Sequence, residues 1–239
     1  MNQVATQTKL KEIVEKSYEV FGKYKLGNTL EVCLHCVTAE EVEPLLKTPL
    51  REISKEMIYE YYSSAQSYGE QELYEMKYFL PRVLELLTKF EFPYHSVEIS
   101  LSRFNLEKNN FEIEEKDILN QFAKSYFALC LEIYPLPDFE NIDSIIIMFG
   151  LAGFQLRPIL EVWTEKFEKN RLLNLNDFFL NQVDYMPYKP FRLKNAFSTK
   201  EINAEIFSWF EQKKQNRHSQ NIPSLQSRKI SLKIPMRAK

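Results

Sequence analysis

The scarcity of glycine is the feature that most restricts the fold of this chain. Only 5 of its 239 residues are Gly, whereas average usage of roughly 7% predicts about three times as many. Tight β-hairpins need residues with positive φ, and phosphate-binding loops need a close backbone approach, both of which Gly supplies at the least steric cost. The shortage therefore argues against β-rich folds and against glycine-rich phosphate-binding loops.

Helical periodicity and helix-start signals point to the opposite class of fold. Apolar residues recur at spacings of three and four over residues 5–24 and 114–134. Thr38-Ala-Glu-Glu41 and Ser198-Thr-Lys-Glu201 have the spacing of capping boxes, in which two side chains satisfy free backbone amides. We predict an all-α fold of about nine helices in antiparallel stacked pairs, irregular and without a fixed-period repeat.

Prolines and caps divide the rest of the helical pattern. Ser54 can cap one helix, and the pattern from Glu70 to Phe90 contains Pro81, which predicts a kink or a break. The apolar run at 145–149 predicts a buried helix. Residues 29–37 are apolar and ambiguous. Further helices are expected at 39–47, 95–106, 140–152, 155–168 and 174–184.

The charge distribution separates the C-terminus from the rest of the chain. Residues 212–239 contain eight Lys or Arg and no Asp or Glu, which leaves 23 basic and 33 acidic residues in residues 1–211. We predict a single helical domain over 1–211 and a basic, flexible tail over 212–239. The tail could contact nucleic acid by neutralising phosphates, although it has no aromatic platform for stacking bases.

The N-terminal residues and the length of the apolar runs indicate where in the cell the protein is expected to work. The segment MNQVATQTKLKEIVEK is polar and charged, unlike the continuous apolar stretch of a signal peptide. No apolar run reaches the ~20 residues that cross a bilayer. We expect a cytoplasmic protein that does not enter the membrane, with Cys33, Cys36 and Cys130 as reduced thiols.

Cys33-Leu-His-Cys36 is the one reactive spacing in the chain. Two thiols separated by two residues can form a redox pair or half of a zinc site, and His35 could lower a thiol pKa or ligate the metal. A redox motif of this kind normally lies between a strand and a helix, and a zinc site needs further ligands. We expect Cys33 and Cys36 to be buried structural side chains, and we expect no bound cofactor. The alternatives are a metal site formed by Cys33, His35 and Cys36, or redox chemistry of the two thiols.

Charged and aromatic residues gather around Pro81. A helix break beside an Arg can form a ligand site, although a kinked packing helix with charged edges is the ordinary explanation. The acidic cluster at 112–117 is explained by a solvated first turn, where negative charge complements the helix dipole. The candidates for contact with a partner are Arg51, Lys77, Tyr78 and Arg82.

Three runs of residues carry a resemblance to a known group of proteins. Cys33-Leu-His-Cys36, Lys47-Thr-Pro49-Leu-Arg51-Glu and Lys77-Tyr-Phe-Leu-Pro81-Arg82-Val-Leu-Glu-Leu86 resemble uncharacterised bacterial cytoplasmic helical proteins, some of which are associated with polymorphic or contact-dependent toxin systems. The resemblance covers residues 30–90 and, more faintly, the helical remainder up to about Trp163, and it implies no catalytic residues.

The chain has no G-x-S-x-G, H-E-x-x-H, Walker or G-x-G-x-x-G pattern. The leading hypothesis is a non-enzymatic protein-interaction protein, in its most specific form an immunity factor that binds and neutralises a toxin. The alternatives are a thiol- or metal-dependent enzyme that uses Cys33 and Cys36, and a nucleic-acid accessory protein that acts through residues 212–239.

Overall fold

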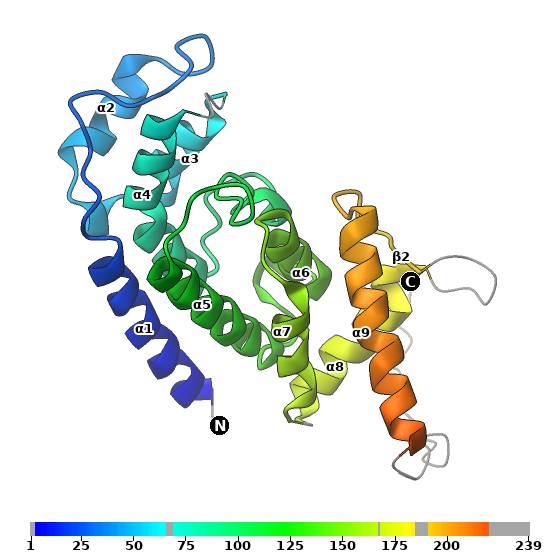
Figure 1. Cartoon of the computed structure of the whole chain (residues 1–239). Coiled ribbons are helices and arrows are strands. Elements are labelled where there is room, and N and C mark those ends of the chain that lie inside the picture. The colour runs from blue at the N-terminus through cyan, green and yellow to red at the C-terminus, as the bar shows by residue number, and fades with distance from the viewer. Residues whose placement is uncertain (1–2, 66–68, 167, 185–190, 220–239) are drawn as a thin grey trace, which may run out of the picture.

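The computed structural model describes residues 3–65, 69–166, 168–184 and 191–219, and these residues form nine α-helices and one two-stranded sheet (Figure 1). The all-α prediction is confirmed. The helices are α1 Gln3–Val20, α2 Ala39–Lys47, α3 Lys55–Ser63, α4 Glu70–Thr88, α5 Ile113–Leu131, α6 Ile142–Leu151, α7 Leu156–Glu161, α8 Lys169–Asp177 and α9 Lys200–Ser219.

Short segments of other structure connect these helices. The 3-10 turns are η1 Leu50–Glu52, η2 Val97–Ile99, η3 Pro137–Phe139 and η4 Val162–Thr164, and a π-helical segment, η5 Phe178–Gln182, continues α8. Strands β1 Val183–Asp184 and β2 Arg192–Leu193 pair antiparallel, with Val183 opposite Leu193. The sheet is too small to alter the fold class.

The predicted caps of α2 and α3 are present. At α2, the Thr38 hydroxyl accepts from the Glu41 amide at 3.3 Å while the Glu41 carboxylate accepts from the Thr38 amide at 2.7 Å, which completes the capping box. At α3, the Ser54 hydroxyl accepts from the Met57 amide at 3.3 Å. These local signals place both helix starts correctly.

Of the kink or break predicted at Pro81, the break is wrong, because α4 runs through this residue from Glu70 to Thr88. A proline inside a helix removes one backbone hydrogen bond and crowds the preceding turn. Pro81 is itself buried, together with most of α4. Tertiary packing on several sides holds the helix together where local propensity would end it.

Several other predicted boundaries need correction. The N-cap of α9 is Thr199 rather than Ser198, since the Thr199 hydroxyl accepts from the Ile202 amide. Residues 95–106 form only the turn η2, residues 29–37 form neither helix nor strand, and α8 begins at Lys169, earlier than expected. The predicted domain boundary at residue 212 falls inside α9, and residues 220–239 of the predicted tail lie outside the described residues.

Helices α1 and α5 lie side by side and run antiparallel (Figure 1). Near the start of α1, the Thr6 hydroxyl donates to Glu132, just beyond the end of α5, at 2.9 Å. Just beyond the end of α1, Lys23 pairs with Glu115 in the first turn of α5 at 3.0 Å. The two ends of the pair are therefore fixed by polar contacts.

Helices α4 and α5 follow one another in the chain but run in the same direction. Lys77 of α4 lies 2.8 Å from Glu115 near the start of α5, and just beyond the end of α4 the ring of Phe90 lies 5.9 Å from that of Tyr126, further along α5. Residues 89–112 return the chain between the two helices. This part of the fold departs from the predicted antiparallel pairs.

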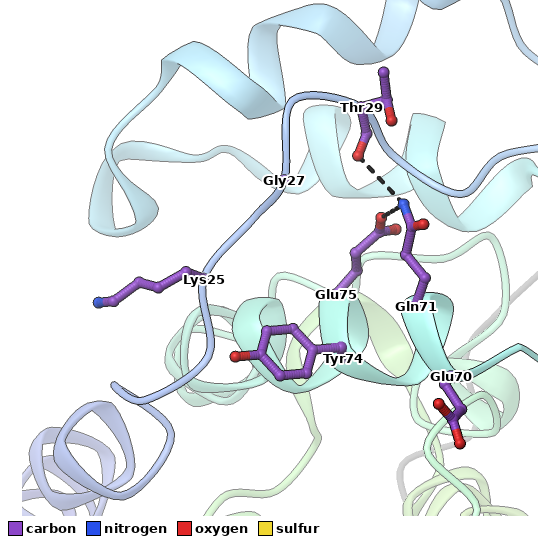
Figure 2. A pocket seen from close by; sticks show the side chains of 7 residues that line it. All are labelled: Lys25, Gly27, Thr29, Glu70, Gln71, Tyr74 and Glu75. Carbon is purple, nitrogen blue, oxygen red and sulfur yellow. Dashed lines mark hydrogen bonds between the residues drawn. The ribbon is translucent and has the colours of Figure 1, made fainter.

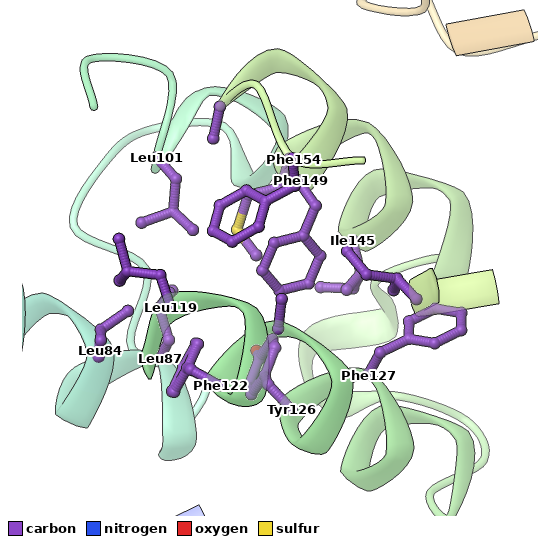
Figure 3. Close-up of a cluster of buried hydrophobic side chains, with 14 of the residues drawn as sticks. Leu84, Leu87, Leu101, Leu119, Phe122, Tyr126, Phe127, Ile145, Phe149 and Phe154 are labelled. Atoms are coloured by element: carbon purple, nitrogen blue, oxygen red, sulfur yellow. The ribbon is translucent and has the colours of Figure 1, made fainter. Parts of the chain in front are cut away.

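The core lies where α4, α5 and α6 meet (Figure 3). Leu84 and Leu87 of α4 face Phe122 of α5 and Phe149 of α6, and all four are buried. Eight of the ten residues of α6 are buried, so the apolar run forms a buried helix, as predicted. None of the helices that the structure describes is both long and apolar enough to cross a membrane.

Helix α9 packs against α6 and α7 in the C-terminal half. A Cβ on Gly150 of α6 would lie 2.8 Å from the Ile202 side chain, so the missing side chain permits this close approach. Further along α9, the Trp209 ring stacks on Trp163 with centroids 6.3 Å apart. Aromatic and aliphatic contacts thus attach the last helix to the rest.

Candidate functional site

An open pocket lies between the start of α4 and the loop that follows α1. It has a volume of about 380 Å³, and we call it the Glu75 pocket. Figure 2 shows Gln71 and Glu75 reaching from α4 toward Thr29 of the loop, whereas the Lys25 side chain points away from them. The lining residues are Lys25, Gly27, Thr29, Glu70, Gln71, Tyr74 and Glu75.

Glu75 is buried in this pocket and receives four hydrogen bonds. The Glu31 amide donates to both carboxylate oxygens at 3.0 Å, the Tyr61 hydroxyl donates to Oε2 at 3.0 Å, and Gln71 Nε2 donates to Oε1 at 2.8 Å. All four bonds are donated to the carboxylate, as an ionised Glu requires. Glu75 thereby fixes the loop to α4 and α3.

The charge of Glu75 is not balanced by a cation within the described residues. Its side chain is 2% exposed, and burial raises its pKa while the hydrogen bonds from Gln71, the Glu31 amide and Tyr61 oppose the rise. The nearby Glu31 carboxylate adds negative charge. Among the described residues, no Lys, Arg or His forms an ion pair with Glu75, although buried charges in proteins are usually paired.

The other buried charges of α4 differ from Glu75 because each has an oppositely charged partner. Such pairing offsets part of the cost of removing both ions from water. The pairs are Glu72 with Arg103 at 3.4 Å, Lys77 with Glu115 at 2.8 Å, and Arg82 with Glu85 at 2.8 Å.

Tyr74 adds an aromatic surface to the pocket. Its side chain is 43% exposed, its ring meets Tyr24 edge-on with centroids 4.8 Å apart, and its hydroxyl donates to the Lys23 carbonyl at 3.4 Å. An aromatic face attracts a cation through its quadrupole. The pocket therefore combines a buried carboxylate with a ring that solvent can reach, and this combination suits a cationic group.

A second polar cluster lies behind Tyr74, around Glu115. Lys77 Nζ donates to Glu115 Oε2 at 2.8 Å, to the Tyr24 hydroxyl at 3.1 Å and to the Asn110 carbonyl at 2.6 Å, and Tyr24 in turn donates to Glu115. Burial alone would raise the pKa of Glu115, but the hydrogen bonds from Lys77 and Tyr24 lower it to about 2. The polar groups of this cluster satisfy one another, so we assign the cluster a role in stabilising the fold.

The structure places the four predicted interaction residues inside the protein's own contact network. Lys77 and Arg82 are buried, and Arg82 donates to the Ile53 carbonyl at 2.6 Å. Arg51 is exposed but pairs with Glu15 at 2.7 Å. Tyr78 is half-buried. Contact of these four residues with a partner stays a prediction, and the structure shows that Lys77 and Arg82 are buried and paired within the chain.

Cys33 and Cys36 occupy a turn between the loop that follows α1 and the start of α2. The Cys36 amide donates to the Cys33 carbonyl at 2.8 Å, and the Val37 amide donates to the same carbonyl at 3.1 Å. Cys36 is exposed and Cys33 half-buried, so the expectation of two buried structural thiols is wrong. The backbone amide of His35, followed by the Cys36 thiol, lowers the pKa of Cys33.

The predicted metal ligands do not assemble into a site. Within the part of the chain that the structure describes, no group of three His, Cys, Asp or Glu side chains could hold a metal ion. Cys130, the third thiol of the chain, is buried in the core. The side chains of Cys33, His35 and Cys36 therefore do not meet around one point, as the ligands of a zinc site must.

Sequence reasoning grouped Glu75 with the charged residues around Pro81 and gave it no role of its own. One signal for Glu75 was present, since it lies four residues before Phe79 on the apolar face of α4. An acid inside an apolar stripe is expected to be either paired or functional. Glu115 was grouped with its exposed neighbours in the acidic cluster, but its burial and its contacts with Lys77, Tyr24 and Lys23 separate it from them.

Comparisons of the chain with family models, curated proteins and solved structures found no match. The resemblance to the bacterial helical proteins therefore stays a prediction.

Proposed function

We propose that the protein is a non-enzymatic interaction protein and that the Glu75 pocket receives a Lys or Arg side chain of a partner protein. The observation that carries this proposal is the buried Glu75 carboxylate, which neutral donors hold in an open pocket and which forms no ion pair with a Lys, Arg or His among the described residues. A cation entering the pocket would gain the attraction of Glu75 and contact with the ring of Tyr74.

The charge of residues 1–211 favours the same kind of partner. Residues 1–211 carry 33 acidic and 23 basic residues. A field of this sign attracts basic proteins and raises their association rate more than it raises final affinity. The most specific form of the proposal is an immunity factor that neutralises a basic toxin, and its support is this charge together with the resemblance over residues 30–90.

Nucleic-acid binding through residues 212–239 stays a prediction. Residues 212–219 belong to α9, and Lys213 forms an ion pair with Glu161. The remaining residues of that segment lie outside the described part of the chain. The described geometry therefore gives more support to binding at the pocket.

Peptide binding to the full-length protein tests the proposal. A short peptide rich in Lys and Arg, labelled for fluorescence anisotropy, is titrated against wild type, Glu75→Gln and Tyr74→Ala. We expect binding that weakens several-fold in both variants and weakens further as salt is raised, because charges at an open site are screened. A peptide of equal length with Gln in place of Lys and Arg should bind far more weakly.

Glu165→Gln is the matched control, since Glu165 is an exposed acid at the end of η4 and its loss changes net charge by the same amount. Circular dichroism confirms that each variant is folded. If Glu165→Gln and Glu75→Gln weakened peptide binding equally, net charge alone would attract the peptide, and the proposal of binding at the Glu75 pocket would be contradicted. The immunity form of the proposal is tested by exposing cells to a toxin encoded by a neighbouring gene and measuring whether this chain protects them.

A further inference from the structure

The turn at Cys33 brings two thiols close together on the surface. A four-residue turn closed by a bond from the fourth amide to the first carbonyl holds its end Cα atoms within roughly 7 Å, and a disulfide needs about 4.4–6.8 Å. The Cys36 amide donates to the Cys33 carbonyl at 2.8 Å. The backbone therefore already has a shape that accepts a bond between the two sulfurs.

Both ends of this turn are fixed, while its tip is open to solvent. The Cys33 amide donates to the Ser64 hydroxyl at 2.6 Å, and Val37 is buried next to the cap of α2. Between them, Leu34 is 69% exposed and Cys36 is exposed. A dissolved disulfide can reach the thiols without any opening of the fold.

The two thiols of the turn are not equivalent. Cys33 has a lowered pKa because the His35 amide and the Cys36 thiol stabilise its thiolate. Cys130 provides the contrast within the same chain, because burial in the core raises its pKa. Thiolate character and exposure together decide which thiols react.

We propose that Cys33 and Cys36 form a reversible disulfide by exchange with low-molecular-weight disulfides. The Cys33 thiolate attacks one sulfur of the small disulfide, whose S–S bond breaks and releases a thiolate that takes up a proton. The Cys36 thiolate then attacks Cys33 Sγ of the mixed disulfide and releases the second small thiol. The protein loses two electrons and two protons, and the small disulfide is reduced to two thiols.

Oxidised glutathione is the probe, and the full-length reduced protein is the sample. After incubation, we expect an intact mass lower by two hydrogens, no retained glutathione, and loss of alkylation by N-ethylmaleimide at Cys33 and Cys36 that dithiothreitol restores. Cys130 should resist alkylation in the native protein before and after oxidation, because it is fully buried.

Single substitutions separate the two roles. Cys36→Ser should retain one glutathione on Cys33, and Cys33→Ser should take up glutathione at Cys36 more slowly than Cys36→Ser takes it up at Cys33. Both positions are partly exposed, so the folded state should persist, and circular dichroism checks it. Two retained glutathiones on the wild type, a disulfide-linked dimer, no reaction, or equal rates for the two variants would each overturn the proposal.

Discussion

Lys77 Nζ lies 2.8 Å from Glu115 Oε2, and this ion pair joins α4 to α5 inside the protein. The Lys77 side chain is 5% exposed and the Glu115 side chain 0%. Removing both ions from water is costly, and mutual attraction offsets that cost only while both partners are present. The pair therefore makes each helix depend on the other for its position.

Glu115 should make the protein sensitive to acid. Its pKa in the folded protein is about 2, below the ordinary value of 4.5, so its contribution is fully present above about pH 4.5 and is lost as the pH falls toward 2. We expect a loss on the order of 3 kcal/mol over this window, and a flatter profile for Glu115→Gln in urea unfolding at several pH values. Glu114→Gln, an exposed neighbour, should keep the wild-type slope.

Replacing Lys77 by Met should destabilise the protein strongly. The substitution leaves Glu115 buried without its ammonium partner, which typically costs about 3–5 kcal/mol. Lys23 remains 3.0 Å from Glu115 and is 43% exposed, so we expect the lower end of this range. The double variant Lys77→Met/Glu115→Gln should lose less than the sum of the single losses in urea unfolding, and strict additivity would contradict the coupling.

The Cys33→Ser/Cys36→Ser variant should unfold at nearly the wild-type temperature. Substitutions at partly exposed positions usually change stability by no more than about 0.5 kcal/mol. If both thiols were buried, as expected from the sequence, the loss of stability would be larger. Cys130→Ala, in the core, should cost about 1–2 kcal/mol. Differential scanning calorimetry distinguishes these outcomes, and a marked fall for the Ser variant would indicate contacts beyond those described.

A chain shortened to end at Glu211 should be less stable than one shortened to end at Ser219. The shorter chain loses the Lys213–Glu161 ion pair, the Gln212–Arg157 hydrogen bond and the final turns of α9 that follow Trp209. These contacts are near the surface, so we expect about 1 kcal/mol, or a melting temperature lower by about 2–4 °C. Equal melting temperatures would show that the sequence-based boundary at residue 212 is adequate.

The helices that could be predicted are those whose signals are local. The apolar stripe of α5, the apolar run of α6 and the cap at Thr38 are each contained in a short stretch of sequence. The continuity of α4 through Pro81 could not be predicted, because it depends on packing against segments far along the chain. The parallel course of α4 and α5 likewise depends on the path of residues 89–112.

The candidate site was harder to predict than the fold. Glu115 and Lys77 are 38 positions apart, and Glu75 and the Glu31 amide are 44 positions apart, so no local pattern joins them. Cys33 and Cys36 were noticed, but the general preference of free Cys for interiors gave the wrong environment. Their exposure follows from the turn that precedes α2, which the ambiguous composition of residues 29–37 did not reveal.

The buried charges of α4 determine whether fragments of this chain could fold on their own. Their partners come from both sides of the helix in the sequence: the Glu31 amide for Glu75, the Ile53 carbonyl for Arg82, Arg103 for Glu72 and Glu115 for Lys77. A cleavage at any peptide bond between residues 31 and 115 separates at least one charge from its partner. Two such fragments should therefore fold only when mixed, so fragment complementation, rather than independent folding, is the behaviour expected of this half of the protein.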